Sequence, residues 1–471
     1  MFNRLLNKLF QISLILFIFS LNFIFCSKKS DSYLILPLVN NTSDNSNFNN
    51  TNNAGTNPAN SNLDLAFNSK GFVVQDMSSG YSKVNSMIVD SYGKILVAGH
   101  CFDGRNTNFC VAKFNPDGSL DTTFGNSGKV HINLFRNIGD NFYAAYSIEF
   151  DRSLSNYYKP ILMSGYCNGR FCIIKLNYDG SLDKNFGSSG VVTLDPISYP
   201  YDDALISRYS ILPSYGDYFL VAYTCNDANS RKFCVSKLYY NGALYTTFGT
   251  NGKTIIDIGS GDDYVTAIKF QSNKIVVTGS CSDGTSFKFC VARLNIDGSL
   301  DTTFGTNRKN IIDIASGDDY ATSMEIEISE RIRLGGYCFD QDSYKFCMAS
   351  LKVNGFLDDQ LFGVLSKVIY NIDNGNDFAY SLKIQSDGKI LLGGHCGNGI
   401  GYYRFCFIRL WDNRPDYTFG SNGKIIADFV LGNEFGRSIA IQQDGKILLS
   451  GECDSNGDFN HNKFCIARFK N

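Results

Sequence analysis

One short phrase recurs seven times along this chain of 471 residues and constrains the fold more than any other feature. Its clear form is Leu-Asp-x-x-Phe-Gly, and its clear and degraded copies begin at Leu63, Leu120, Leu182, Leu244, Leu300, Leu357 and Pro415. Successive copies lie 57, 62, 62, 56, 57 and 58 residues apart. A period of this length is typical of solenoids, propellers and other repeat arrays.

Within each repeat, short apolar runs alternate with breaks rich in Gly and Asp, which is the pattern of β-strands rather than helices. The fourth copy predicts four strands, at Lys253–Ile258, Tyr264–Phe270, Lys274–Ser280 and Phe289–Asn295. Four strands in each of seven units predict an all-β fold, a seven-bladed β-propeller of four-stranded antiparallel blades that occupies residues 63–471.

Two phrases carry a resemblance to a known family. One is YGKILVAG from Tyr92, with later copies DGKILLGG from Asp387 and DGKILLSG from Asp444. The other is NxDGSLDTTFG, from Asn115 and Asn295. Together they resemble the delta-sixty repeat family of bacterial propeller-like proteins, and the layout is similar to that of NHL-type propellers. The resemblance implies that the strand after the Gly-rich turn is innermost, and that the protein binds or scaffolds rather than catalyses.

The two ends of the repeat region predict how the ring closes. The stretch Leu63–Asp76 has no earlier partner, and the last copy ends at Phe464–Phe469 without a following strand. If the strand after each Leu-Asp-x-x-Phe-Gly phrase forms the outer edge of a blade, the first stretch completes the seventh blade and removes an open sheet edge. The alternative is that each unit forms one whole blade that starts with the strand at Phe72.

Fourteen of the fifteen cysteines fall into pairs, one pair in each repeat. The pairs are Cys101/Cys110, Cys167/Cys172, Cys225/Cys234, Cys281/Cys290, Cys338/Cys347, Cys396/Cys406 and Cys453/Cys465. Placing Cys281 directly opposite Cys290 in a hairpin puts Gly279 opposite Ala292 and leaves room for a disulfide. The intervening loops vary from 4 to 11 residues, which no metal-ligand spacing would tolerate. The pairs therefore predict seven disulfides and no metal site, with reduced buried thiols as the alternative.

The N-terminus predicts export. Residues 1–25 place Arg4 and Lys8 before a mostly apolar run, as in a signal peptide, with an uncleaved membrane anchor as the alternative. Cys26 has no partner among the repeats and resembles the lipidated cysteine of a bacterial lipoprotein. Residues 26–62 then supply the lipid anchor and a flexible tether rich in Asn and Ser. These features predict an extracytoplasmic location at the bacterial cell envelope, on the outer membrane or cell surface.

Acidic residues precede the expected inner strand in six of the seven copies. They are Asp140, Asp203, Asp263, Asp319, Asp377 and Glu434. On a propeller they would ring the mouth of the central channel and form a binding site for a cation such as calcium or for a basic partner. The alternative is that these residues only form the turns between blades. No resident cofactor is expected.

The function predicted by these features is binding. A formal net charge of −2 gives no basic surface of the kind that nucleic acid requires. No HExxH, GxSxG or phosphate-loop motif indicates an enzyme. We therefore expect an exported, lipid-anchored interaction module whose partner is a protein, a glycan or a surface component. Two alternatives remain, an extracytoplasmic hydrolase or lyase with its site at the channel mouth, and a structural envelope protein.

Overall fold

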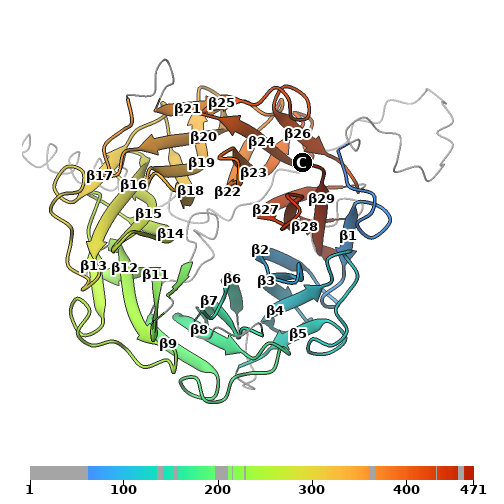
Figure 1. Ribbon diagram of the computed structural model, residues 1–471, viewed down its shortest axis with the longest axis horizontal. Helices are drawn as coiled ribbons and strands as arrows, with labels where there is room; N and C mark the ends of the chain where they lie inside the picture. The colour runs from blue at the N-terminus through green and yellow to red at the C-terminus, as the bar shows by residue number, and fades with distance from the viewer. Residues whose placement is uncertain are drawn as a thin grey trace, which may run out of the picture. The chain divides into compact units, whose positions relative to one another are not determined.

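The computed structural model describes residues 62–134, 142–152, 158–196, 210–214, 216–227, 230–359, 366–430, 432–454 and 461–471. They form seven antiparallel sheets that follow one another around a ring (Figure 1). No α-helix occurs in these ranges. The prediction of an all-β, seven-bladed β-propeller is confirmed.

Each of the first six blades runs from an innermost first strand to an outermost last strand. Blades one to three contain β2 (Ser82–Val89), β3 (Ile95–Phe102), β4 (Thr107–Phe114) and β5 (Lys129–Ile132); β6 (Tyr143–Phe150), β7 (Ile161–Cys167), β8 (Arg170–Leu176) and β9 (Val191–Pro196); and β10 (Ser210–Pro213), β11 (Tyr218–Asp227), β12 (Ser230–Tyr239) and β13 (Lys253–Ile256). Blades four to six contain β14 (Asp263–Gln271), β15 (Lys274–Ser282), β16 (Phe287–Asn295) and β17 (Lys309–Ile312); β18 (Asp319–Ile326), β19 (Ile332–Asp340), β20 (Ser343–Leu351) and β21 (Lys367–Tyr370); and β22 (Asp377–Ile384), β23 (Ile390–Gly397), β24 (Tyr403–Trp411), β25 (Arg414–Pro415) and β26 (Lys424–Ala427).

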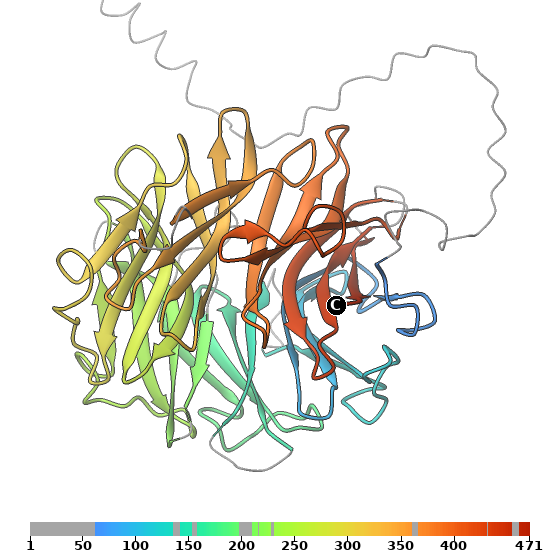
Figure 2. The same ribbon diagram turned by 45° about the horizontal axis from the view of Figure 1, so that its top comes forward.

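The seventh blade joins the two ends of the repeat region. Its sheet order is β1 (Phe72–Gln75), β29 (Lys463–Phe469), β28 (Ile447–Cys453) and β27 (Glu434–Ile441). The antiparallel register pairs Phe72 with Ala467 and Gln75 with Phe464. The first strand, in blue, lies beside the last, in red, in both views (Figures 1 and 2). The shared-blade closure is therefore confirmed, and the alternative of one whole blade per unit is excluded.

The Leu-Asp-x-x-Phe-Gly phrase recurs because it ties blades together. Its phenylalanine is buried and packs against the next blade; Phe304, 0% exposed, lies in one cluster with Ile332 of β19. Its aspartate holds a basic side chain of the third strand, as in the bond of 2.8 Å from Arg293 Nε to Asp301 Oδ2. One phrase thus fixes the outer part of a blade and its contact with the following blade.

A serine ring links the first strands of neighbouring blades. Six first strands contain a β-bulge, and the residue after it is Ser86, Ser147, Ser323, Ser381 or Ser438 in five of them. The Ser381 hydroxyl accepts a hydrogen bond of 3.0 Å from the backbone N–H of Ile439 in the next blade. The Ser438 hydroxyl accepts one of 3.2 Å from Met87 N–H and spans the junction between the seventh and first blades.

The predicted signal peptide at residues 1–25, Cys26 and the tether up to residue 61 lie outside the described residues. Within the described ranges, the structure holds no helix that is long and apolar enough to cross a membrane.

Candidate functional site

The two faces of the ring differ in their connections. First strands begin, second strands end and third strands begin on the same face, which also carries the loops between paired cysteines. We call it the cysteine-loop face. The opposite face carries the short Asp-Gly turns, as predicted. Because long loops usually carry binding residues, the cysteine-loop face is the candidate binding face.

The predicted acidic residues form turns on this face. Asp140 and Asp203 lie outside the described residues, whereas Asp263, Asp319, Asp377 and Glu434 are all 0% exposed. Asp263 Oδ2 accepts a hydrogen bond of 2.8 Å from Ile258 N–H, and Oδ1 accepts one of 3.0 Å from Gly259 N–H. Glu434 Oε1 likewise accepts bonds of 2.7 and 2.8 Å from two backbone amides. This is the geometry of the turn-forming alternative, and a direct contact with calcium or a basic partner stays a prediction.

The residue before each buried acid has a second structural role. Asp262, Asp318, Asn376 and Asn433 accept hydrogen bonds of 2.8, 2.8, 2.9 and 3.0 Å from backbone N–H groups at Arg231, Phe287, Tyr344 and Tyr403. Each donor belongs to the third strand of the preceding blade. In each copy, the first residue of the pair therefore joins two blades, and the second, the buried acid, holds its own turn.

Burial changes the protonation of these acids. Removal from water raises the pKa of Asp319 and Asp377 to about 7 and that of Glu434 to about 8, although backbone amides oppose the shift. Perturbed carboxylates can mark catalytic sites, but buried structural ones are perturbed by the same physics. Here the raised pKa values belong to side chains enclosed within turns.

Glu434 therefore predicts a pH dependence of stability. Its pKa of about 8 in the folded protein exceeds its ordinary value of 4.5, so folding favours the protonated form. This contribution is complete below pH 4.5 and is lost as the pH rises through 8, at a maximum of about 1.4 kcal/mol per pH unit. We expect Glu434→Gln, which keeps an oxygen for the two amides, to have a flatter profile in urea unfolding between pH 5 and 8. An unchanged slope would contradict the assignment.

A continuous group of ring side chains lies on the cysteine-loop face across blades four to seven. This aromatic arc consists of Tyr264, Phe287, Tyr320, Tyr337, Tyr344, Phe378, His395, Tyr403 and Phe435. All nine residues lie near strand ends that meet this face. Phe287, Tyr344, Phe378, Tyr403 and Phe435 are half-buried, and the other members lie buried beside them.

The arc repeats the same contact at three blade junctions. A ring at the start of a third strand packs on a ring at the start of the next blade's first strand. The centroid distances are 5.4 Å for Phe287–Tyr320, 5.2 Å for Tyr344–Phe378 and 5.4 Å for Tyr403–Phe435. Such tilted ring pairs are favourable and hold the rings in fixed positions. The arc is thus a preorganised, partly apolar surface with a blade-to-blade repeat.

Charged side chains stand at both ends of the arc. At one end, the guanidinium group of Arg231 lies 5.2 Å from the Tyr264 ring centroid and 3.4 Å from Asp262. At the other end, Arg437 lies over the Tyr380 ring and pairs with Glu452, with an Nη2–Oε1 distance of 2.7 Å. Both ends therefore combine a cation, a ring and a carboxylate.

Two histidines near the arc are buried. His395 contacts four rings, including Tyr403 at a centroid distance of 5.1 Å. Burial, together with the positive charges of Lys83 and Arg437, lowers the pKa of His100 to about 3. His100 is consequently neutral at physiological pH and adds no charge to this face.

At the opposite end of the first strands, four charged residues share one repeat position. They are Glu149, Lys269, Glu325 and Lys383. Glu325 pairs with Lys269 at 3.1 Å and with Lys383 at 2.7 Å. The four formal charges sum to zero, so this group provides no net attraction for an ion.

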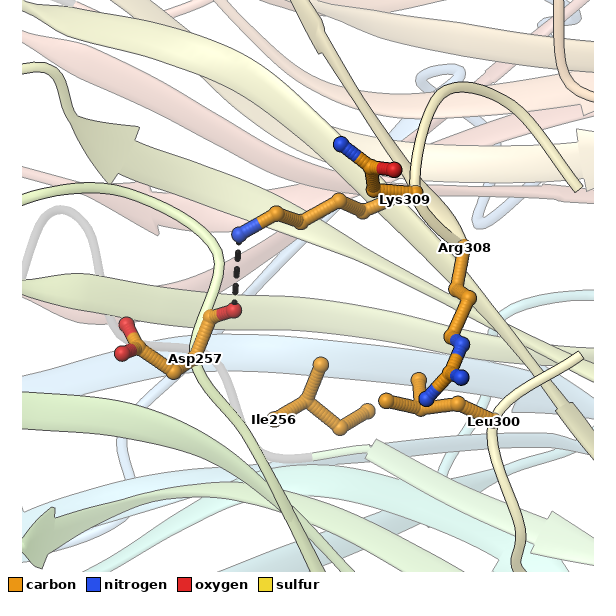
Figure 3. A pocket seen from close by; sticks show the side chains of 6 residues that line it. Ile256, Asp257, Leu300, Arg308 and Lys309 are labelled. Carbon is orange, nitrogen blue, oxygen red and sulfur yellow. Dashed lines mark hydrogen bonds between the residues drawn. The ribbon is translucent and has the colours of Figure 1, made fainter. Parts of the chain in front are cut away.

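The outer rim contains a hollow of about 310 Å³ (Figure 3). It is lined by Ile256, Asp257, Leu300, Asn307, Arg308 and Lys309. Lys309 Nζ donates hydrogen bonds of 3.0 and 2.7 Å to the carbonyl oxygens of Asp257 and Ile258. These bonds join the fourth blade to the third, so the hollow lies at a seam between blades.

Six of the seven predicted disulfides are present: Cys101–Cys110, Cys167–Cys172, Cys225–Cys234, Cys281–Cys290, Cys338–Cys347 and Cys453–Cys465. Such bonds indicate an oxidising compartment. Cys101 and Cys110 also lie near His131, with ligand atoms within 4.8 Å of one another, but their sulfurs are already bonded to each other.

Two predictions about the cysteines are wrong. Gly279, not Cys281, lies opposite Cys290, and Cys281 lies opposite Lys288. The hairpin loop is shorter than expected, and strand twist brings the diagonal cysteines together. In addition, Cys396 and Cys406 are not joined; both are buried and their thiols are hydrogen-bonded to each other.

Thiol labelling tests this difference. Burial raises the pKa of both Cys396 and Cys406, so neither thiol should react in the native protein. We expect two labels in residues 62–471 when the protein is unfolded without reductant, and none before unfolding. Mass spectrometry of alkylated peptides gives the count. No label after unfolding would mean that the sixth blade also contains a disulfide.

Comparison with known proteins supports the propeller fold. A family model described as "Domain of unknown function (DUF5122) beta-propeller" matches residues 93–124 and 271–304. Each matched segment ends in the Leu-Asp-x-x-Phe phrase that follows a blade's third strand. No curated protein matches the chain.

Solved structures with similar folds have diverse descriptions. Drosophila Semaphorin 2a has a TM-score of 0.49 and 9% identity, covering 84% of this chain and 75% of its own. A catalytically inactive virginiamycin B lyase from Staphylococcus aureus, with quinupristin, has a TM-score of 0.46 and 9% identity, covering 84% and 98%. The polysaccharide lyase Uly1 has a TM-score of 0.45 and 10% identity, covering 82% and 89%. At such low identities and TM-scores, the ligands and activities of these proteins say nothing about this chain.

The aromatic arc was missed by the sequence analysis, although the sequence contains a signal for it. The residue after the buried acid is aromatic in four consecutive copies, at Tyr264, Tyr320, Phe378 and Phe435. The residue three positions before the second cysteine is aromatic at Phe287, Tyr344 and Tyr403. Aligning the copies by their cysteines would have revealed both series.

Proposed function

We propose that this protein is an exported, lipid-anchored β-propeller that binds an extracytoplasmic partner at the bacterial cell envelope through the aromatic arc. The observation that carries the proposal is the row of five half-buried rings on one face, held in place by equivalent contacts at three blade junctions. Rigid aromatic side chains supply much of the binding free energy at many protein interfaces.

Location in the envelope rests on two further observations. The six disulfides fit an oxidising compartment. The apolar N-terminal run and Cys26, which has no partner among the repeats, fit export followed by lipidation. Mass spectrometry of the mature N-terminus tests this part, because an unmodified Cys26 would contradict lipid anchoring.

The binding role is favoured over the hydrolase or lyase alternative by the state of the acids. The carboxylates that begin four first strands are enclosed in turns and bonded to backbone amides. General acid–base catalysis needs such groups within reach of a substrate. Three of the five half-buried side chains of the arc are phenylalanines, which have no proton to transfer.

Paired substitutions in the arc test the proposal. We expect Tyr344→Ala combined with Tyr403→Ala to weaken binding of the partner by about tenfold or more, because each ring contributes of order 1 kcal/mol. Tyr417→Ala provides a matched control, since Tyr417 is 72% exposed and lies outside the arc. Purified full-length protein and each variant would be screened on glycan arrays and in pull-downs from envelope extracts, with thermal unfolding to confirm the fold. Binding that survives the double substitution would contradict the proposal.

A further inference from the structure

The repeat positions that form the aromatic arc carry cations where the arc stops. The series formed by Tyr264, Tyr320, Phe378 and Phe435 continues into the first blade as Lys83. Lys83 is exposed to solvent and makes no side-chain hydrogen bond or ion pair within the described part of the chain, while partial removal from water lowers the pKa of its ammonium group. This repeat position therefore changes from an aromatic side chain in the seventh blade to a lysine in the first blade.

The charge of Lys83 is not cancelled by its neighbours. Arg437 and Glu452 face this lysine and interact with it, but they are paired with each other at 2.7 Å and contribute no net charge. His100, which lies opposite Lys83 on the adjacent strand, is neutral. Lys83 is thus an exposed cation at the end of the arc, at the junction of the seventh and first blades.

Exposed acids on this face lie toward one end of the arc, where Asp283 and Asp342 belong to the cysteine loops of the fourth and fifth blades. Asp263, Asp319, Asp377 and Glu434 are buried. Asp262 and Asp318 are partly exposed, but each accepts a backbone hydrogen bond from the preceding blade, and Asp262 also pairs with Arg231. These two acids lie at the end of the arc away from Lys83. A ligand laid along the arc would therefore place its anionic group at the first blade.

The form of the apolar surface also restricts the ligand. Equivalent ring pairs recur from blade to blade, with centroid distances of 5.2 Å for Tyr344–Phe378 and 5.4 Å for Tyr403–Phe435. A polymer of similar units can place successive units on such repeated contacts. Sugar rings present C–H faces that stack on aromatic side chains, and uronic acids add a carboxylate that pairs with an ammonium group.

We propose that the ligand of the aromatic arc is an acidic oligosaccharide, whose sugar rings stack on the half-buried aromatic side chains and whose carboxylate binds Lys83. This inference rests on the proposed binding function and names its ligand class. A protein partner is the competing occupant, and the experiment below separates the two.

The test uses full-length protein and paired glycan probes. Oligogalacturonate and alginate oligosaccharides supply carboxylates, and methyl-esterified oligogalacturonate supplies the same sugar rings without charge. We expect Lys83→Met to weaken binding of the acidic probes by about tenfold and to leave binding of the neutral ester unchanged. Lys70→Met, at an exposed lysine outside the arc, should change neither. Raising the salt concentration should weaken binding of the acidic probes only.

Each outcome separates this inference from the proposed function. Equal binding of acidic and neutral probes that is lost with Tyr344→Ala and Tyr403→Ala, but not with Lys83→Met, would overturn the acidic ligand and keep the arc as the binding surface. A protein partner that depends on the arc, with no glycan bound, would do the same. No ligand of either class that depends on the arc would overturn both proposals.

Discussion

Deleting residues 62–76 is expected to abolish cooperative unfolding of the propeller, whereas deleting residues 1–61 should leave its stability unchanged within about 0.5 kcal/mol. The short segment supplies β1, which pairs with β29 and completes the seventh blade. Without it, β29 becomes an open sheet edge, and the first blade loses its contacts with Phe67 and Val73.

The expected size of the effect follows from what the segment buries. Leu63, Phe67 and Val73 are 2%, 0% and 6% exposed. Burying one such side chain contributes about 1.5–3 kcal/mol, so the three together contribute roughly 5–9 kcal/mol. The free energy of unfolding of a whole domain is only about 5–15 kcal/mol, so loss of this segment removes most of it.

Circular dichroism during thermal and urea unfolding measures the loss. A synthetic peptide of residues 62–76, added in trans, should restore a cooperative transition to the truncated protein, because the segment contains every residue of β1. A truncated protein that unfolds at the wild-type midpoint without peptide would show that ring closure does not depend on β1.

The architecture was predictable because its signals repeat. Seven copies of one phrase specified the number of blades, and alternating apolar runs specified strands to within a few residues; β14 spans Asp263–Gln271 where Tyr264–Phe270 was expected. The unpaired ends of the repeat region predicted the closing blade for a simple reason: a strand without a partner must find one. These properties depend on pattern and period, which sequence contains directly.

The wrong predictions concern features that depend on three-dimensional packing rather than on sequence pattern. The placement of Cys281 opposite Cys290 assumed that disulfide partners are directly opposed, but strand twist joins diagonal neighbours. The sequence showed that Asp263 and Glu434 recur in phase, but only their burial shows that turns enclose them. Nor does spacing distinguish Cys396 and Cys406 from the six bonded pairs, because their loop length lies within the range of the others.

The aromatic arc was missed for a related reason. Aromatic residues are common in this chain, with 27 tyrosines and 38 phenylalanines, so single positions did not stand out. Tyr344 and Phe378 are 34 residues apart, yet their rings lie 5.2 Å apart across a blade junction. Contacts between adjacent blades become visible only when the repeats are placed around the ring.

A single methyl group at Gly279 is expected to destabilise the protein severely, by about 3 kcal/mol or more. Gly279 is the glycine of the Gly-x-Cys phrase in the fourth copy. A Cβ atom there would lie 1.9 Å from the carbonyl oxygen of Tyr264 on the adjacent first strand and 2.8 Å from the Phe233 ring. Because the first of these contacts is with backbone, no rotamer change can relieve it.

The chain contains its own control for this argument. The same repeat position is Gly99, Gly165, Gly336, Gly394 and Gly451 in five other blades, where a Cβ atom would lie 1.8–2.0 Å from a carbonyl oxygen. The third blade instead has Tyr223, which is fully buried. There β10 pairs with β11 only from Ser210, opposite Ala222, so no residue of β10 pairs with Tyr223. Among the described residues, this position has a side chain only in the blade where no residue of the first strand pairs with it.

Urea unfolding of Gly279→Ala measures the effect against Gly216→Ala. Gly216 is exposed, and a Cβ atom there would meet nothing closer than 3.6 Å, so its substitution should change the free energy of unfolding by less than about 0.5 kcal/mol. If Gly279→Ala does not fold, Gly451→Ala in the seventh blade provides a second test of the same contact, at 1.9 Å from the Phe435 carbonyl oxygen. Near-neutral results at both glycines would show that the first strands can move away from the second, and that the Gly-x-Cys phrase recurs for a reason other than this close approach.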